Sequence, residues 1–135
     1  MTTSSNRDPA GATWRAFFLV AAIYDLVLGA AFFVLYGPMF ELLEIALPNN
    51  TAYIHLTAAF VFVQGLGYWL VALDPDDNRG IVRIGVAYKF AFSALALYYL
   101  LIGELLHPVF AVFGGLDVLF LVGFVMFLRL PRRQP

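Results

Sequence analysis

The sequence predicts an all-α integral membrane protein, a four-helix up-down bundle. Between helices 1 and 2 it predicts a short amphipathic helix that lies at the membrane interface. Of the 135 residues, 62% are hydrophobic and 13% charged, which is more apolar than a soluble core of this size could bury. Four apolar stretches of about 20 residues each are long enough to cross ~30 Å of hydrocarbon. Because backbone in lipid must satisfy its own hydrogen bonds, such long stretches without alternation favour helices over barrel strands.

One domain, residues 13–130, contains all four predicted helices. They cover residues 14–36, 52–73, 81–102 and 108–128. The first stretch is too long for a cleaved signal peptide and contains Asp25. The Ser/Thr-rich residues 1–12 are expected to form a disordered tail, and residues 131–135 a basic tail.

The longest connection joins the first two helices and mixes apolar residues with two acidic ones. Residues 38–47 place Glu41 and Glu44 among Met, Phe, Leu and Ile side chains. This pattern is typical of a short amphipathic helix that lies along the interface, and a re-entrant lid is the alternative. The other connections are short, so consecutive helices are expected to be antiparallel neighbours.

The basic residues predict the orientation of the chain. Four crossings place seven arginines on one side: Arg7, Arg15, Arg79, Arg83, Arg129, Arg132 and Arg133. The loops on the opposite side carry Glu41, Glu44 and Glu104 and neither Lys nor Arg. The positive-inside rule therefore predicts that both termini are cytoplasmic.

Three charged residues lie inside the predicted spans: Asp25, Lys89 and Asp117. A charge at the bilayer centre costs ~3 kcal/mol or more on insertion scales, so each needs a partner or a use. Counted at 1.5 Å per residue from the cytoplasmic ends, the three charges and Gln64 lie at depths of about 12–17 Å. Every helix thus places one strongly polar group in a midplane layer. Lys89 is expected to pair with one aspartate or to bridge both.

Two interpretations of this layer stay open. In the first, the ion pair, Gln64 and the hydroxyls of Tyr24 and Tyr88 only hold the helices in register. In the second, one ammonium cannot neutralise two carboxylates, so one carboxylate stays unpaired. That group binds a proton, a cation or another small ligand. Asp25, Gln64, Lys89, Asp117, Tyr24 and Tyr88 are the candidate binding residues.

The first and third predicted helices share a short pattern around their charges. Tyr24-Asp25 corresponds to Tyr88-Lys89, and small residues lie four positions before and after each charge: Ala21 and Gly29 in one helix, Gly85 and Ser93 in the other. Residues four apart share a helix face, and small residues there let helices approach closely. The pattern is that of a duplicated two-helix hairpin, and a chance match is the alternative.

Two histidines are candidate ligands near the outer side. His55 lies one turn into the second helix, and His107 precedes the fourth. Facing imidazoles could ligate haem b or, with a carboxylate, a metal ion, whereas helix capping or an interfacial position is the structural alternative. The absence of cysteine excludes thiol chemistry by this chain. No phosphate loop, activated nucleophile or basic patch for nucleic acid is present, so no catalytic residue is nominated.

Scattered Gly, Pro and Tyr positions give the chain a family resemblance. They are Leu47-Pro48, Tyr53, Gly65-Leu66-Gly67, Leu73-Asp74-Pro75 and Arg83-Ile84-Gly85-Val86-Ala87-Tyr88. In this order and architecture, the chain resembles the small bacterial DoxX-like four-helix membrane proteins. The resemblance implies a bacterial inner membrane and, for some members, association with quinone- or thiol-linked oxidoreductases. The lack of cysteine and the deep Lys89 depart from the better-known members.

The expected function is that of a non-catalytic membrane component or subunit whose polar layer fixes packing and binds a small ligand or ion. One alternative is a proton- or cation-coupled carrier or channel that uses Asp25 and Asp117. Another is a haem- or quinone-associated oxidoreductase subunit that uses His55 and His107. The expected partners are the lipid bilayer and either further copies of the chain or other membrane subunits.

Overall fold

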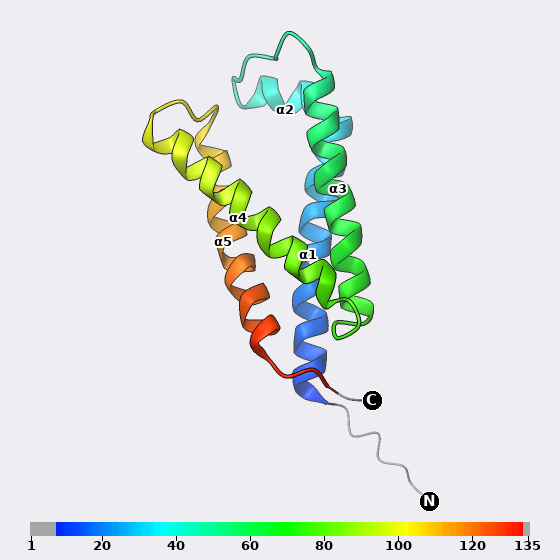
Figure 1. Ribbon diagram of the computed structural model, residues 1–135. Coiled ribbons are helices and arrows are strands. Elements are labelled where there is room, and N and C mark those ends of the chain that lie inside the picture. Colours follow the sequence, from blue (N-terminus) through cyan, green and yellow to red (C-terminus); the bar gives the residue numbers. More distant parts are fainter. Residues whose placement is uncertain (1–7, 134–135) are drawn as a thin grey trace, which may run out of the picture.

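The computed structural model describes residues 8–133, and all regular secondary structure in that part of the chain is helical (Figure 1). The helices are α1 (Pro9–Val34), α2 (Tyr36–Leu42), α3 (Ala52–Leu73), α4 (Arg79–Leu101) and α5 (Pro108–Arg129). The four longest, α1, α3, α4 and α5, are each long and apolar enough to span a membrane. The predicted all-α class is therefore confirmed.

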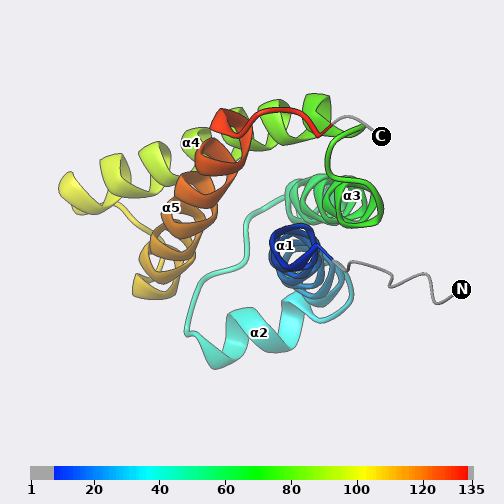
Figure 2. The same cartoon turned by 90° about the horizontal axis from the view of Figure 1, so that it is seen from below.

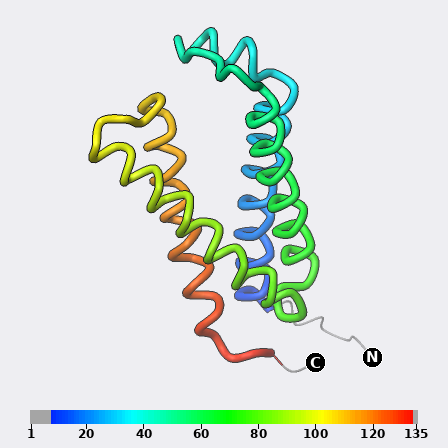
Figure 3. Tube along the Cα trace, turned by 45° about the horizontal axis from the view of Figure 1, so that its top comes forward, coloured from blue at the N-terminus to red at the C-terminus, as the bar shows by residue number. Residues whose placement is uncertain are grey.

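The long helices form two pairs, α1 with α3 and α4 with α5 (Figure 2). The pairs meet near the ends of the chain and diverge toward α2 (Figures 1 and 3). We call the first region the terminal end; it also contains the α3–α4 turn. The opposite region, with α2 and the α4–α5 turn, is the α2 end.

Helix α1 begins at Pro9, five residues before the predicted start. Asp8 caps it, because its Oδ1 accepts a hydrogen bond from the Ala10 N–H at 3.2 Å. Pro9 occupies the first helical position, where no backbone N–H is needed. Residues 9–12, expected in a disordered tail, are thus helical, and residues 1–7 of that tail lie outside the described residues.

Helix α2 begins at Tyr36, two residues before the predicted segment 38–47. Only Leu35 separates it from α1. Phe40 is buried and packs edge-on against Phe32 of α1, with ring centroids 6.5 Å apart. Glu44 has a left-handed backbone (φ 54°), and the Ile45 N–H donates to the Phe40 carbonyl at 2.9 Å. This turn ends the helical segment before residue 47.

The α1–α3 pair is held by close backbone contact. A Cβ added at Gly29 would lie 2.6 Å from the backbone N of Phe62 and 2.8 Å from the Ala58 carbonyl oxygen. A Cβ at Gly65 would lie 2.8 Å from the backbone N of Leu26. Only glycine therefore lets the two helices approach this far.

Aromatic and small side chains from all four long helices fill the terminal end. The cluster comprises Phe18, Ala21, Ala22, Tyr68, Val71, Val82, Phe124 and Phe127. Phe18 and Phe124 stack across the two pairs at a centroid distance of 5.3 Å. The two helix pairs are therefore packed against each other in this half of the molecule.

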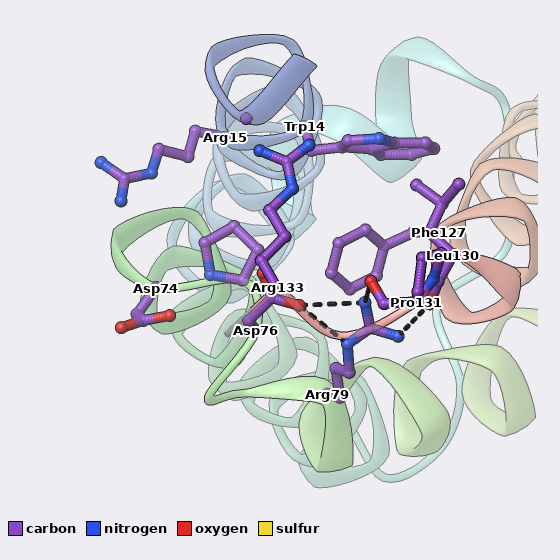
Figure 4. Close-up of a pocket in the computed structure, with 11 residues that line it drawn as sticks. Trp14, Arg15, Asp74, Asp76, Arg79, Phe127, Leu130, Pro131 and Arg133 are labelled. Carbon is purple, nitrogen blue, oxygen red and sulfur yellow. Dashed lines mark hydrogen bonds and ion pairs between the residues drawn. The ribbon is translucent and has the colours of Figure 1, made fainter. Parts of the chain in front are cut away.

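Arg79 fixes the chain after α5 at the terminal end (Figure 4). Its guanidinium donates to the Leu130 carbonyl at 2.9 Å, to the Pro131 carbonyl at 3.3 Å and to Asp76 Oδ1 at 3.0 Å. It also lies over the Phe127 ring, 4.7 Å from the centroid. A lysine has one nitrogen and could not reach all these acceptors together.

We therefore expect Arg79→Lys to release residues 130–133 and to cost about 1 kcal/mol of stability. Carboxypeptidase digestion of the purified protein measures the release, which should be several-fold faster in the variant. Arg83→Lys is the control, because Arg83 lies on the same helix and is exposed. Equal digestion of the two variants would show that Arg79 does not hold this segment.

Candidate functional site

Lys89 of α4 bridges two aspartates from different helices at the centre of the molecule. Its Nζ donates to Asp25 Oδ1 at 2.8 Å, to Asp25 Oδ2 at 3.0 Å and to Asp117 Oδ1 at 2.8 Å. The exposed fractions are 1% for Lys89, 1% for Asp25 and 4% for Asp117. An ammonium has three N–H donors, and all three are used. We call these residues the charge triad.

The triad joins the two helix pairs. Asp25 belongs to α1 of the first pair, whereas Lys89 and Asp117 belong to α4 and α5 of the second. The sequence placed Asp25 and Lys89 at equivalent positions of a possible repeat, and the structure brings these two side chains together. Of the two pairings expected for Lys89, the structure thus shows the bridge to both aspartates.

Four aromatic rings surround the ammonium. Those of Tyr24, Tyr68, Tyr88 and Phe120 have centroids between 5.2 and 5.6 Å from Lys89 Nζ. Such contacts stabilise a cation that has left water. We call these rings the aromatic collar.

Sequence reasoning missed two members of this collar, Tyr68 and Phe120. Helical spacing could have found them, since Tyr68 lies four residues after Gln64 and Phe120 three after Asp117. Gly85 makes room for Tyr68, because a Cβ there would lie 2.8 Å from the Tyr68 ring. The small residues around the charges therefore accommodate aromatic rings as well as helix backbones.

Gln64 lies beside the triad and does not bond to it. Its Nε2 donates to Tyr68 Oη at 3.2 Å, and within residues 8–133 none of its hydrogen bonds reaches a charged group. Helix α3 therefore meets the ammonium through Tyr68.

Two of the polar atoms around the triad that have no hydrogen-bond partner in the described residues are Asp117 Oδ2 and Tyr24 Oη. Within residues 8–133, both oxygens of Asp25 accept from Lys89, whereas no hydrogen bond ends on Asp117 Oδ2. In the same part of the chain, Tyr24 Oη is buried without a partner. Counted as ions, the triad has a charge of −1. A free acceptor and a free donor thus lie in the layer that carries a surplus negative charge.

An apolar cleft of about 420 Å³ lies at the α2 end. All five helices contribute aromatic residues to its wall: Phe32, Phe40, Tyr53, Phe92, Phe110 and Phe113. We call it the aromatic cleft.

The floor of the aromatic cleft lies one helical turn from the triad. Gly29 follows Asp25 by four residues, Phe92 follows Lys89 by three, and Phe113 precedes Asp117 by four. In each helix the cleft residue is on the α2 side of the charge. The cleft therefore descends from the α2 end to within about 5.4 Å, one turn, of the charged layer.

The two histidines make local contacts at the α2 end. The His55 ring packs against those of Phe33 and Tyr36, at centroid distances of 4.7 and 5.0 Å. His107 Nδ1 accepts from the Val109 N–H at 3.0 Å and so caps α5. In the described residues, no group of three or more histidine or acidic side chains could hold a metal ion.

Haem ligation by these histidines stays a prediction. If these histidines ligate haem, the visible spectrum of the purified protein should show a Soret band.

No family model, curated protein or solved structure matches this chain. The DoxX-like resemblance therefore stays a prediction, and the function is argued from the site.

Proposed function

We propose that the protein is a multi-pass component of a bacterial inner membrane, without catalytic activity of its own. The four long helices cross the bilayer as an up-down bundle, with both termini in the cytoplasm and α2 on the outer interface. Two features support this arrangement: the apolar length of the helices, and the gathering of arginines at the terminal end and glutamates at the α2 end.

The charge triad has two tasks in this proposal. It holds the two helix pairs in register, and its surplus negative charge takes up one proton or one small monovalent cation. The supporting observation is the charge balance: one ammonium donates all three of its hydrogen bonds to the carboxylates of two aspartates. A net charge in lipid is costly unless it is neutralised. Asp117 Oδ2 and Tyr24 Oη are the groups that would hold the proton or cation.

Infrared spectroscopy of the purified protein tests this uptake. We expect a protonated-carboxyl C=O band that shifts in D₂O and disappears in Asp117→Asn. If a cation is held instead, the carboxylate bands should change when Na⁺ or K⁺ is added. Absence of both responses would contradict the proposal.

Tyr24→Phe separates binding from packing. The variant removes a buried hydroxyl that has no protein partner, so thermal stability should stay the same or rise slightly. The carboxyl band or the cation response should nevertheless change, since the hydroxyl is a proposed ligand. Tyr88→Phe is the matched control, because the Tyr88 ring belongs to the same aromatic collar, with its centroid 5.3 Å from Lys89 Nζ. If Tyr24→Phe leaves the infrared response unchanged, Tyr24 does not contact the bound proton or cation.

A proton- or cation-coupled carrier is the second candidate, and the asymmetry of the molecule favours it. The α2 end has a cleft whose floor lies one helical turn from the triad, whereas aromatic and small side chains pack between the helix pairs on the terminal side of the triad. Access from one side at a time is the property that a carrier needs. Proton or cation uptake into liposomes should then be lost in Asp25→Asn and Asp117→Asn, and uptake that survives both changes would exclude this candidate.

A further inference from the structure

We infer that the aromatic cleft binds a lipophilic organic cation: a molecule with an apolar body and one permanent positive charge. The inference rests on the proposed function in one respect: the organic cation would replace the proton or small cation that neutralises the surplus negative charge of the triad. The shape and lining of the cleft are independent of it.

The dimensions and lining of the cleft fit such a molecule. Its volume of about 420 Å³ lies within the ~300–1,000 Å³ common for small-molecule sites. The faces of its aromatic rings are electron-rich and attract cations that have left water. Tyr53 and Leu106 in its wall are 69% and 70% exposed, so the cleft is open at the α2 end.

The charges around the cleft select the sign of the ligand. Below the floor, the triad carries one more carboxylate than ammonium. At the α2 end, Glu41 and Glu104 are exposed but do not line the cleft, and Glu41 lines a separate hollow beside Gly37 and Pro38. Among residues 8–133, every Lys or Arg other than Lys89 lies toward the terminal end, and the donors of Lys89 are all used. In this part of the chain, the charge nearest the floor of the cleft is therefore the surplus negative charge of the triad, and no free cation lies beside it.

Other occupants fit these charges less well. A lipid acyl chain would match the apolar wall but would leave the surplus charge unpaired. A second copy of the chain in the same orientation would bring no Lys or Arg to this depth except its own buried Lys89. An anion would be repelled by the surplus negative charge of the triad.

Two ions of the same shape and opposite charge test the inference. We would measure saturable binding of tetraphenylphosphonium and of tetraphenylborate to the full-length protein in a nonionic detergent, with protein-free micelles as the blank. The phosphonium should bind at one site, at least about tenfold more tightly than the borate. Saturable binding of both ions with equal affinity would overturn the inference in favour of an acyl-chain site. Failure of the phosphonium to bind, as when a second copy covers the cleft, would also overturn it.

Two substitutions on α4 locate the bound cation. Phe92→Ala removes a ring from the cleft and should weaken phosphonium binding about tenfold. Phe90→Ala is the matched control, because Phe90 is 62% exposed and is not in the cleft wall. Equal affinities of the two variants would place the cation elsewhere and overturn the inference.

The infrared experiment and the binding experiment can fail separately. Cation-selective binding that Phe92→Ala weakens, in a protein without an infrared response, would contradict uptake by the triad and leave the cation site in place. An infrared response without phosphonium binding would contradict the cation site in the cleft and leave uptake by the triad in place. The comparison of the two ions uses the unaltered chain, so it holds even if Asp117→Asn does not fold.

Discussion

Lys89→Met is expected to destabilise the protein by about 3 kcal/mol or more, the largest effect of any single change considered. The substitution keeps most of the side-chain volume but leaves the carboxylates of Asp25 and Asp117 buried with no cation. Equilibrium unfolding in detergent, followed by circular dichroism, measures the loss. A protein with unchanged stability would show that the ammonium does not hold the helix pairs together.

Neutral replacement of all three charges is the control for this variant. In the triple variant Asp25→Asn, Lys89→Met and Asp117→Asn, no buried charge is left without a partner. Its stability should therefore lie between that of Lys89→Met and that of the unaltered chain. If the triple variant is less stable than Lys89→Met, the loss comes from altered packing and not from unpaired charge.

Gly29→Ala should cost about 1–3 kcal/mol, the second-largest effect. The added Cβ would lie 2.6 and 2.8 Å from backbone atoms of α3, which cannot turn away as a side chain could. The α1–α3 pair must therefore separate slightly. The same unfolding experiment measures the cost.

Gly115→Ala is the matched control for Gly29→Ala. Gly115 also lies inside a long helix, but no atom is within 4 Å of the added Cβ. Alanine favours the helix, so this variant should be as stable as the unaltered chain or slightly more stable. Equal losses in the two variants would point to a general cost of replacing glycine and not to contact between α1 and α3.

The sequence predicted the long helices well because length and hydropathy alone define them. Helix α3 has the predicted bounds, and α5 differs by one residue at its end. The start of α1 was missed because Asp8 and Pro9 lie in a polar segment, where a helix cap resembles a loop. The divergence of the pairs has no signal in any one helix, because it depends on contacts between the pairs such as the one between Phe18 and Phe124.

The candidate site was predictable in its charges and less so in its geometry. Because Asp25, Lys89 and Asp117 lie at similar depths along their helices, the sequence predicted that they share one layer. The bridge from Lys89 to both aspartates was one of the two pairings expected. The contact of Gln64 with Tyr68 depends on rotation of α3 about its axis, which depth does not determine. The aromatic cleft depends on the angle between the helix pairs and therefore could not be predicted.

A double-mutant cycle between Lys89 and each aspartate tests the central claim, that one buried ammonium holds the two helix pairs together. The free energy of unfolding would be measured for the unaltered chain, Lys89→Met, each Asp→Asn variant and the corresponding double variants. We predict a coupling energy of at least about 1 kcal/mol between Lys89 and Asp25 and a similar value between Lys89 and Asp117. A coupling energy of zero between Lys89 and Asp25, which belong to different helix pairs, would contradict the account.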